Sequence, residues 1–150
     1  MKILGIETST MTGSIALMDE ERLIAEYTLN LAETHTSRLM PAIDRVLKDA
    51  SLTVKDLDGI AVSLGPGSFT GLRIGIATAK GLAQGLNIPV VGIPTLDGLA
   101  FNLFNCKDLV CPILDARKGE VYTALYKNGK RLTKHMACKP NRLLEELRSW

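Results

Sequence analysis

The amino-acid sequence predicts an α/β protein with the ribonuclease-H-like order of elements: a mixed sheet with helices, followed by an incomplete second copy of the same fold. Two observations predict it. The expected elements of residues 1–105 follow the order β-β-β-α-β-α-β-α, whose parallel crossovers must be right-handed. After Lys107 an apolar run that ends in a carboxylate, residues 109–115, resembles residues 3–7.

Five strands are predicted in the first lobe from short runs of apolar and β-branched residues. These runs are residues 2–7, 13–18, 23–29, 59–64 and 87–93. The first three form a meander, because the acidic turn Asp19-Glu20-Glu21 separates the second run from the third.

Three helices are predicted between or after these strands. Apolar residues at positions 39, 40, 43, 46, 47 and 50 keep the 3.6-residue period of an amphipathic helix over residues 35–50. The second helix covers about residues 70–85, and the third covers residues 95–104. In the core or in helix packing against it we expect Leu39, Ile43, Leu47, Ile60, Val62, Leu72, Ile76 and Ala79.

Composition predicts a soluble cytoplasmic protein. The chain has 150 residues, of which 46% are hydrophobic and 23% are charged, which is typical of a globular protein. No apolar run approaches the roughly 20 residues that cross a bilayer, so no membrane contact is expected. Three cysteines without metal-ligand spacing favour a reducing compartment. We expect a ribonuclease-H-like lobe at residues 1–105, and the start of a truncated second lobe with a terminal helix at residues 106–150.

Charge is distributed unevenly between these two parts. Residues 1–105 carry a net charge of −3, and residues 106–150 carry a net charge of +5. A basic segment can meet RNA or an acidic partner. A solvated surface is the simpler interpretation, because no aromatic residues are interleaved with the charges.

The densest motif is the glycine-rich stretch from Gly65 to Gly75, which links the fourth strand to the second helix. Bare backbone N–H groups at the positive end of a helix suit a phosphate. However, no Lys-Ser/Thr pair follows Gly71, and Thr70 stands where the third glycine of GxGxxG would be. The alternative is structural, since glycines also permit a tight turn and close helix packing.

A second motif, Glu7-Thr8-Ser9-Thr10, ends the first strand. An acidic residue and hydroxyls at such a turn can handle metal-bound phosphates, or they can satisfy the backbone of the turn. We favour the structural role, because no further acidic groups complete a metal site. The residues of a possible vestigial phosphate site are Glu7, Thr8, Gly65, Gly67 and Ser68.

No catalytic residue, metal ligand or cofactor is predicted. His35 is followed four residues later by Leu39, and the only other histidine, His135, lies far away in the chain. The sequence contains no Gly-x-Ser-x-Gly elbow either, so a hydrolase is poorly supported.

Four motifs together are similar to those of the TsaB (YeaZ) family. They are ILGIETS at residues 3–9, HTSRLMP at 35–41, GPGSFTGLRIG at 65–75 and DARKGEVY at 115–122. The resemblance runs from Met1 to about Tyr126. It implies a cytoplasmic bacterial protein of the sugar-kinase/Hsp70/actin superfamily. The catalytic relative carries a metal-binding His-x-x-x-His in its first helix, where this sequence has His35 and Leu39.

The resemblance also implies a function and a set of partners. The function is that of a non-catalytic scaffold or activating subunit in the complex that transfers a threonylcarbamoyl group to tRNA adenosine next to the anticodon. The expected partners are a second copy in a homodimer, a catalytic TsaD-like subunit and a TsaE-like ATPase, with tRNA reached indirectly through the complex. The alternatives are an ATP-dependent phosphotransferase of the same fold and, more weakly, a peptidase.

The first and second predicted helices are expected to form the partner interface. Small residues along the second helix allow another helix to approach closely, and glycine inside a helix costs about 1 kcal/mol relative to alanine. An exposed Ile74 next to the first helix is expected to complete an apolar patch. The interface residues predicted in this way are His35, Leu39, Ile43, Arg73, Ile74, Ala77 and Gly81.

Overall fold

The computed structural model describes residues 1–20, 22–30 and 35–148, and it divides the chain into two compact units. The first unit is Met1–Ile93 and the second is Pro94–Trp150. The sequence analysis placed the boundary after residue 105, so the third predicted helix falls in the second unit instead of the first. Each unit is described by itself below.

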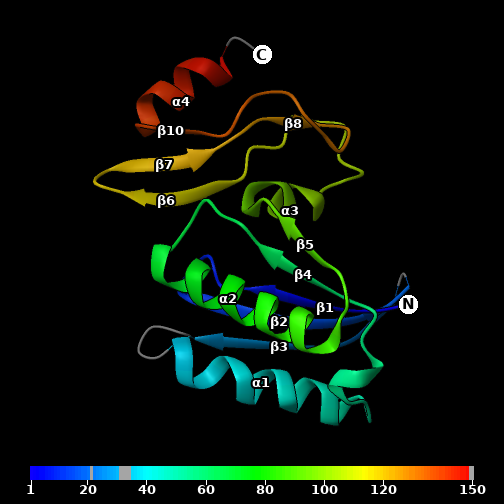
Figure 1. Cartoon of the computed structure of the whole chain (residues 1–150). Coiled ribbons are helices and arrows are strands. Elements are labelled where there is room, and N and C mark those ends of the chain that lie inside the picture. The colour runs from blue at the N-terminus through cyan, green and yellow to red at the C-terminus, as the bar shows by residue number, and fades with distance from the viewer. Residues whose placement is uncertain (21, 31–34, 149–150) are drawn as a thin grey trace. The chain divides into compact units, whose positions relative to one another are not determined.

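The first unit contains a five-stranded mixed sheet in the order β3-β2-β1-β4-β5 (Figure 1). Strand β1 pairs antiparallel with β2 and parallel with β4, as the meander and the crossover predict. The bounds are Lys2–Glu7 for β1, Thr12–Asp19 for β2, Arg22–Asn30 for β3, Gly59–Ser63 for β4 and Val90–Ile93 for β5. The predicted five strands and their mixed sheet are confirmed.

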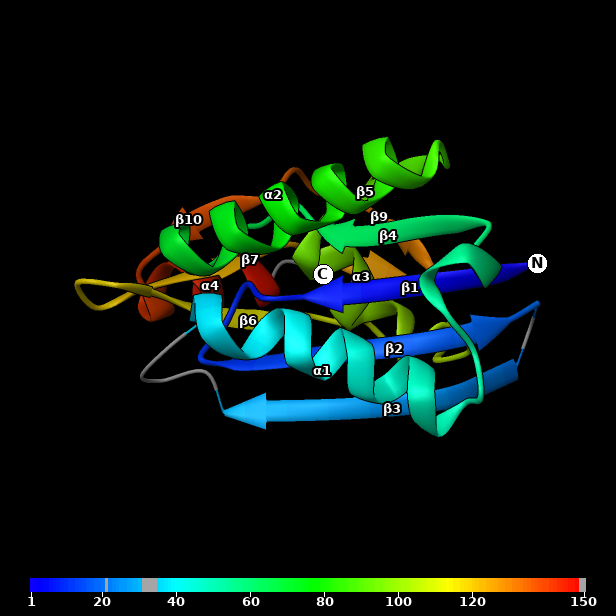
Figure 2. The same cartoon turned by 60° about the horizontal axis from the view of Figure 1, so that its bottom comes forward.

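Two long helices cover one face of this sheet. Helix α1 (His35–Asp49) and helix α2 (Phe69–Leu86) lie side by side on that face (Figure 2). Beneath them, alternate residues of β1, β2 and β4 point into the core, because strand side chains alternate between faces. These residues are Leu4, Ile6, Ile15, Leu17, Ile60 and Val62, each at most 4% exposed. A short 3₁₀ turn, η1 (Val54–Asp56), precedes β4.

Six of the eight predicted core residues are buried: Leu39, Ile43, Leu47, Ile60, Val62 and Ala79. Of the other two, Ile76 is half-buried and packs against this core, as predicted, whereas Leu72 is half-buried and is not among the residues packed against it. The inward stripe of α2 is instead Gly71, Gly75, Ala79 and Ala83, one position earlier in its first two turns. The sequence pattern missed this shift because it assigned the largest apolar side chains to the core, whereas α2 approaches the sheet through its glycines.

The second unit combines two short helices with small antiparallel sheets. Strands β6 (Ile113–Arg117), β7 (Glu120–Thr123) and β10 (Met136–Cys138) form a sheet in the order β10-β7-β6. Strands β8 (Tyr126–Lys127) and β9 (Lys130–Arg131) form a separate hairpin. Helix α3 (Thr95–Phe101) begins the unit, and α4 (Pro140–Leu147) follows β10. The apolar run after Lys107 therefore does begin a new antiparallel meander.

One carboxylate joins α3 to the β8–β9 hairpin. Asp97 Oδ1 accepts a hydrogen bond of 2.6 Å from the Tyr126 hydroxyl and lies 3.2 Å from Arg131 Nη1 and 3.0 Å from His135 Nε2. Partial burial raises the pKa of Asp97, but the hydrogen bonds from Tyr126 and His135 and the charge of Arg131 outweigh it, so this pKa is lowered. Burial and the bond to Asp97 raise the pKa of Tyr126 well above its ordinary value.

Because the pKa of Tyr126 is raised, the free energy of unfolding should fall as the pH becomes alkaline. Because the neutral phenol is favoured in the folded state, its contribution is fully present below the ordinary tyrosine pKa of about 10 and is lost as pH rises through the raised value. We expect the difference in melting midpoint between the wild type and Tyr126→Phe to shrink above about pH 10. Thermal melts from pH 8 upward measure it, and a difference that stays constant with pH contradicts the prediction.

Candidate functional site

The two motifs of the possible phosphate site meet at one edge of the first unit's sheet. Because β1 and β4 are parallel, their carboxyl ends lie together, and the loop after β4 reaches the turn after β1. The Thr8 amide lies 3.4 Å from Ser63 Oγ, and the Ser68 amide donates to the Ser9 carbonyl at 2.5 Å. The Ser9 amide donates to the Glu7 carboxylate. The structure therefore brings the predicted residues together.

Glycines bring this loop and α2 into direct contact with the turn. A Cβ added to Gly67 would lie 2.3 Å from the Ser9 carbonyl oxygen, and one added to Gly75 would lie 2.2 Å from Thr8 Oγ1. Real Cβ atoms do not approach other atoms so closely, so only glycine fits either position. Gly65 adopts a φ of 98°, which also favours glycine. These contacts match the structural role weighed for the glycines above.

The hydroxyls at this turn face protein instead of solvent. Thr8 and Ser9 are 1% and 2% exposed, and neither hydroxyl has a hydrogen-bond partner among the described residues. Ser68 is the N-cap of α2 and accepts a hydrogen bond of 3.3 Å from the Gly71 amide. In this arrangement the side chains of Thr8 and Ser9 are not presented to solvent. Among the described residues, no group of three or more His, Cys, Asp or Glu side chains could hold a metal ion.

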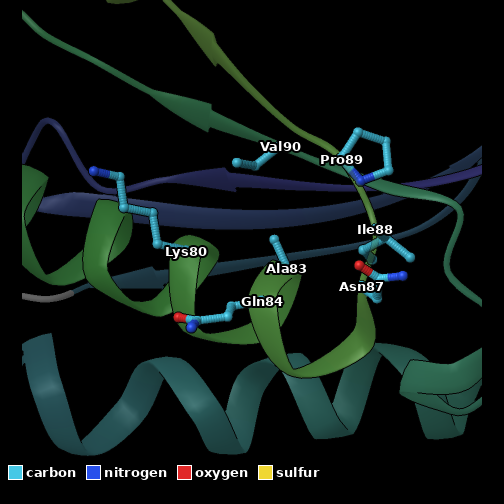
Figure 3. Close-up of a pocket in the computed structure, with 7 residues that line it drawn as sticks. All are labelled: Lys80, Ala83, Gln84, Asn87, Ile88, Pro89 and Val90. Atoms are coloured by element: carbon cyan, nitrogen blue, oxygen red, sulfur yellow. The ribbon is translucent and has the colours of Figure 1, made fainter.

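A pocket of about 560 Å³ lies at the other end of α2 (Figure 3). Figure 3 shows Lys80, Ala83 and Gln84 on the helix, with Pro89 just before β5 and Val90 at the start of that strand. Lys80 is the only charged residue of its lining, and none of the predicted site residues contributes to it. The pocket is therefore separate from the Glu7 turn.

The predicted partner interface needs correction at three positions. Leu39 and Ile43 are 2% and 1% exposed in the core of the first unit, so their side chains are not available to a partner. Ile74, predicted to be exposed, is half-buried and packs against the same core. Leu39 and Ile43 lie on the apolar face of α1 that packs on the sheet, where they were also predicted as core residues, and only Ile74 extends the inward face of α2 beyond the predicted stripe. The side chain of His35 lies outside the described residues.

The other three predicted interface residues, Arg73, Ala77 and Gly81, are exposed on α2. A Cβ added to Gly81 or Gly85 would meet nothing within 4 Å among the described residues, in contrast to one added to Gly75. Phe69, which was not among the predicted interface residues, is 68% exposed on the first turn of α2 and lies under the Arg73 guanidinium at 3.7 Å. Its aromatic ring four residues before Arg73 was the available signal. We call Phe69, Arg73, Ala77, Gly81 and Gly85 the outer face of α2.

None of the described helices is both long enough and apolar enough to span a bilayer.

Comparisons with known proteins agree on one group of relatives. The family model described as "TsaD: tRNA N6-adenosine threonylcarbamoyltransferase" matches residues 22–148. The "tRNA threonylcarbamoyladenosine biosynthesis protein TsaB" of Bacillus subtilis (strain 168) is 47% identical over 131 residues, which are 86% of this chain and 57% of that protein. The protein of the same name from Escherichia coli (strain K12) is 40% identical over 132 residues, 87% of this chain and 57% of the relative. The chain thus spans a little over half the length of these relatives.

Solved structures extend the comparison to the fold. "YeaZ from Pseudomonas aeruginosa" superposes with a TM-score of 0.83 at 32% identity, over 93% of this chain and 68% of that one. A ROK hexokinase from Thermus thermophilus superposes with a TM-score of 0.55 at 14% identity, over 89% of this chain and 49% of that one, and shows the fold alone. The predicted sugar-kinase-like α/β fold is confirmed.

The two kinds of glycine on α2 predict opposite effects of the same substitution. Gly75→Ala forces a methyl group against Thr8 and should destabilise the protein by about 1–3 kcal/mol, as overpacking does. Gly85→Ala enters open space and should stabilise it by up to about 1 kcal/mol. Urea denaturation of both variants measures the changes, and equal effects at the two positions contradict the packing described here.

Proposed function

This chain belongs to the TsaB (YeaZ) family, and from that premise we propose that it is a non-catalytic scaffold and activating subunit of the complex that transfers a threonylcarbamoyl group to the tRNA adenosine next to the anticodon. The observation that carries the proposal is the 47% identity to the Bacillus subtilis TsaB over 131 residues. The catalytic step belongs to a TsaD-like subunit, and a TsaE-like ATPase completes the assembly. Substrate tRNA meets the catalytic centre on the TsaD-like subunit, in the cytoplasm.

Two features of the first unit support a role without catalysis. The Thr8 and Ser9 hydroxyls, which a phosphotransferase of this fold would turn toward a nucleotide, are covered by the Gly67 loop and by α2. Leu39, at the position where the catalytic relative is expected to carry a metal-binding histidine, is 2% exposed in an apolar core. An imidazole there would be buried without a hydrogen-bond partner, which is costly.

The outer face of α2 supports a helix-mediated interface. Gly81 and Gly85 each cost about 1 kcal/mol relative to alanine in a helix interior, and no contact within the described residues explains them. A helix of another chain that packs against Ala77 and Gly81 would use the space that these small residues leave. Because the family model of the catalytic relatives also matches this chain, one surface can serve a homodimer and a pairing with the TsaD-like subunit.

A charged side chain on this face should break the interface. We expect Ala77→Arg to abolish the dimer, measured by light scattering, and to abolish capture of a TsaD-like subunit. Thermal stability should change little, because Ala77 is exposed. Ala137→Arg, at an exposed alanine of β10, is the matched control and should behave as the wild type. An Ala77→Arg protein that remains dimeric and still captures the subunit would show that the interface lies elsewhere.

A measurement of nucleotide binding distinguishes the proposed scaffold function from the alternative, an ATP-dependent phosphotransferase. We expect isothermal titration of the chain with ATP and magnesium to show no binding at low micromolar concentration, because the turn is closed around Thr8 and Ser9. Tight binding, together with ATP hydrolysis that is lost in Glu7→Ala, would replace the scaffold with an ATP-dependent enzyme.

A further inference from the structure

The β8–β9 hairpin of the second unit presents two lysines, Lys127 and Lys130, that form no ion pair with another described residue. Its two-residue turn, Asn128 and Gly129, has positive φ at both positions, which is typical of a tight type I′ hairpin. The register sets Tyr126 opposite Arg131 and Lys127 opposite Lys130. Residues 126–135 contain four lysines and arginines and no acidic residue.

The Tyr126–Arg131 pair, at the base of the hairpin, is fixed by contacts to α3. Tyr126 is 4% exposed, and both Tyr126 and Arg131 bind Asp97 of α3. The Leu132 amide also donates to the Leu125 carbonyl at 2.7 Å, which continues the pairing beyond the hairpin. The Lys127–Lys130 pair, next to the turn, therefore extends from a pair of residues that is fixed on α3.

The pairing of Lys127 with Lys130 is electrostatically unfavourable in the isolated chain. Lys127 and Lys130 are exposed and stand directly opposite each other, and like charges in that arrangement destabilise a strand pair. Within the described part of the chain, neither these two lysines nor the nearby Lys134 forms an ion pair. By contrast, Arg45 and Lys48 on α1 each have a carboxylate partner, at 2.9 and 2.6 Å. An anionic ligand would remove the repulsion.

Aromatic rings lie at the tip of this hairpin, at Gly129 between the two lysines, although no aromatic residue is interleaved with the lysines in the sequence. A Cβ added to Gly129 would lie 2.5 Å from the Phe104 ring, so this ring packs against the tip of the hairpin. Half of the Phe104 surface is still exposed, and Phe101, with its ring centre 5.4 Å away, is 70% exposed. Exposed rings next to unpaired cations are what a single-stranded nucleic acid needs, because bases stack on rings and phosphates contact lysines.

We propose that Lys127, Lys130, Phe101 and Phe104 form a direct contact surface for an unpaired segment of RNA. The lysines contact phosphates, and the rings stack on bases. The proposal rests on the proposed function for the identity of the RNA, a tRNA, and it goes beyond that function by adding a contact on this chain to the one on the TsaD-like subunit. An acidic protein would use the lysines but has no need of the exposed rings.

The test measures binding of a fluorescent tRNA transcript to the full chain by anisotropy, over a series of salt concentrations. For Lys127→Gln/Lys130→Gln, the slope of log K against log salt should become shallower by about 1.4, because each of the two lysines contributes about 0.7 to the slope when it neutralises a phosphate. Phe101→Ala should weaken binding by about 5-fold or more at every salt concentration, with an unchanged slope. The matched controls are Lys55→Gln and Tyr27→Ala, exposed residues of the first unit that should leave RNA binding unchanged.

An unchanged slope in the double lysine variant, or unchanged affinity in Phe101→Ala, overturns the proposal. It is also overturned if poly-glutamate binds more tightly than the RNA and loses affinity in the same lysine variant, because the partner is then an acidic protein. Capture of a TsaD-like subunit by the double lysine variant separates the two hypotheses. If the double lysine variant captures the subunit and its RNA binding is unaltered, only the proposed RNA surface is contradicted. If the wild type fails to capture the subunit, the proposed function is contradicted.

Discussion

The first unit depends on the direct contact of α2 with the central strand β1. Parallel pairing places the end of β4 beside the end of β1, and the loop that follows must cross the Thr8-Ser9 turn before α2 can begin. Gly67 and Gly75 make this crossing possible, because each lies where a Cβ would be less than 2.5 Å from an atom of Ser9 or Thr8. The direction of α2, the burial of Ala79 and Ala83, and the position of α1 beside it all follow from this approach.

The same contact explains why a turn with the composition of a phosphate site is closed. Hydroxyls, a carboxylate and a helix N-terminus gather there, but the glycines draw the loop onto the hydroxyls instead of leaving a cradle. Elements that could serve a nucleotide in one protein of this fold can serve packing in another, since function resides in the site and not in the fold. Under the proposed function, the outer face of α2, whose Arg73, Ala77 and Gly81 are exposed, serves association.

In the second unit, the carboxylate of Asp97 has a comparable organising role. It accepts hydrogen bonds from Tyr126 and Arg131 across the hairpin and so ties α3 to this two-stranded ribbon. The tie gives the two exposed lysines a defined position on a hairpin whose tip contacts the ring of Phe104. The two units thus offer surfaces of different chemistry: mostly small residues beside Phe69 and Arg73 on α2, and basic and aromatic residues around the hairpin.

The sequence by itself determined the element order, the mixed sheet, most of the core and the family. Each of these depends on local periodicity or on a long contiguous motif such as residues 65–75, and both are properties of the chain before it folds. The sequence could not decide which side of α2 faces inward. Apolar size favours Leu72 and Ile76, whereas the approach to Thr8 requires glycine at position 75 and buries the face of α2 that also carries Gly71. It assigned Leu39 and Ile43 to the core and to the interface alike, and only the packing of α1 on the sheet resolved that conflict. Only the tertiary structure brought Phe104 to Gly129 and Asp97 to Tyr126, since these pairs lie 25 and 29 residues apart and no local pattern encodes contacts at that separation.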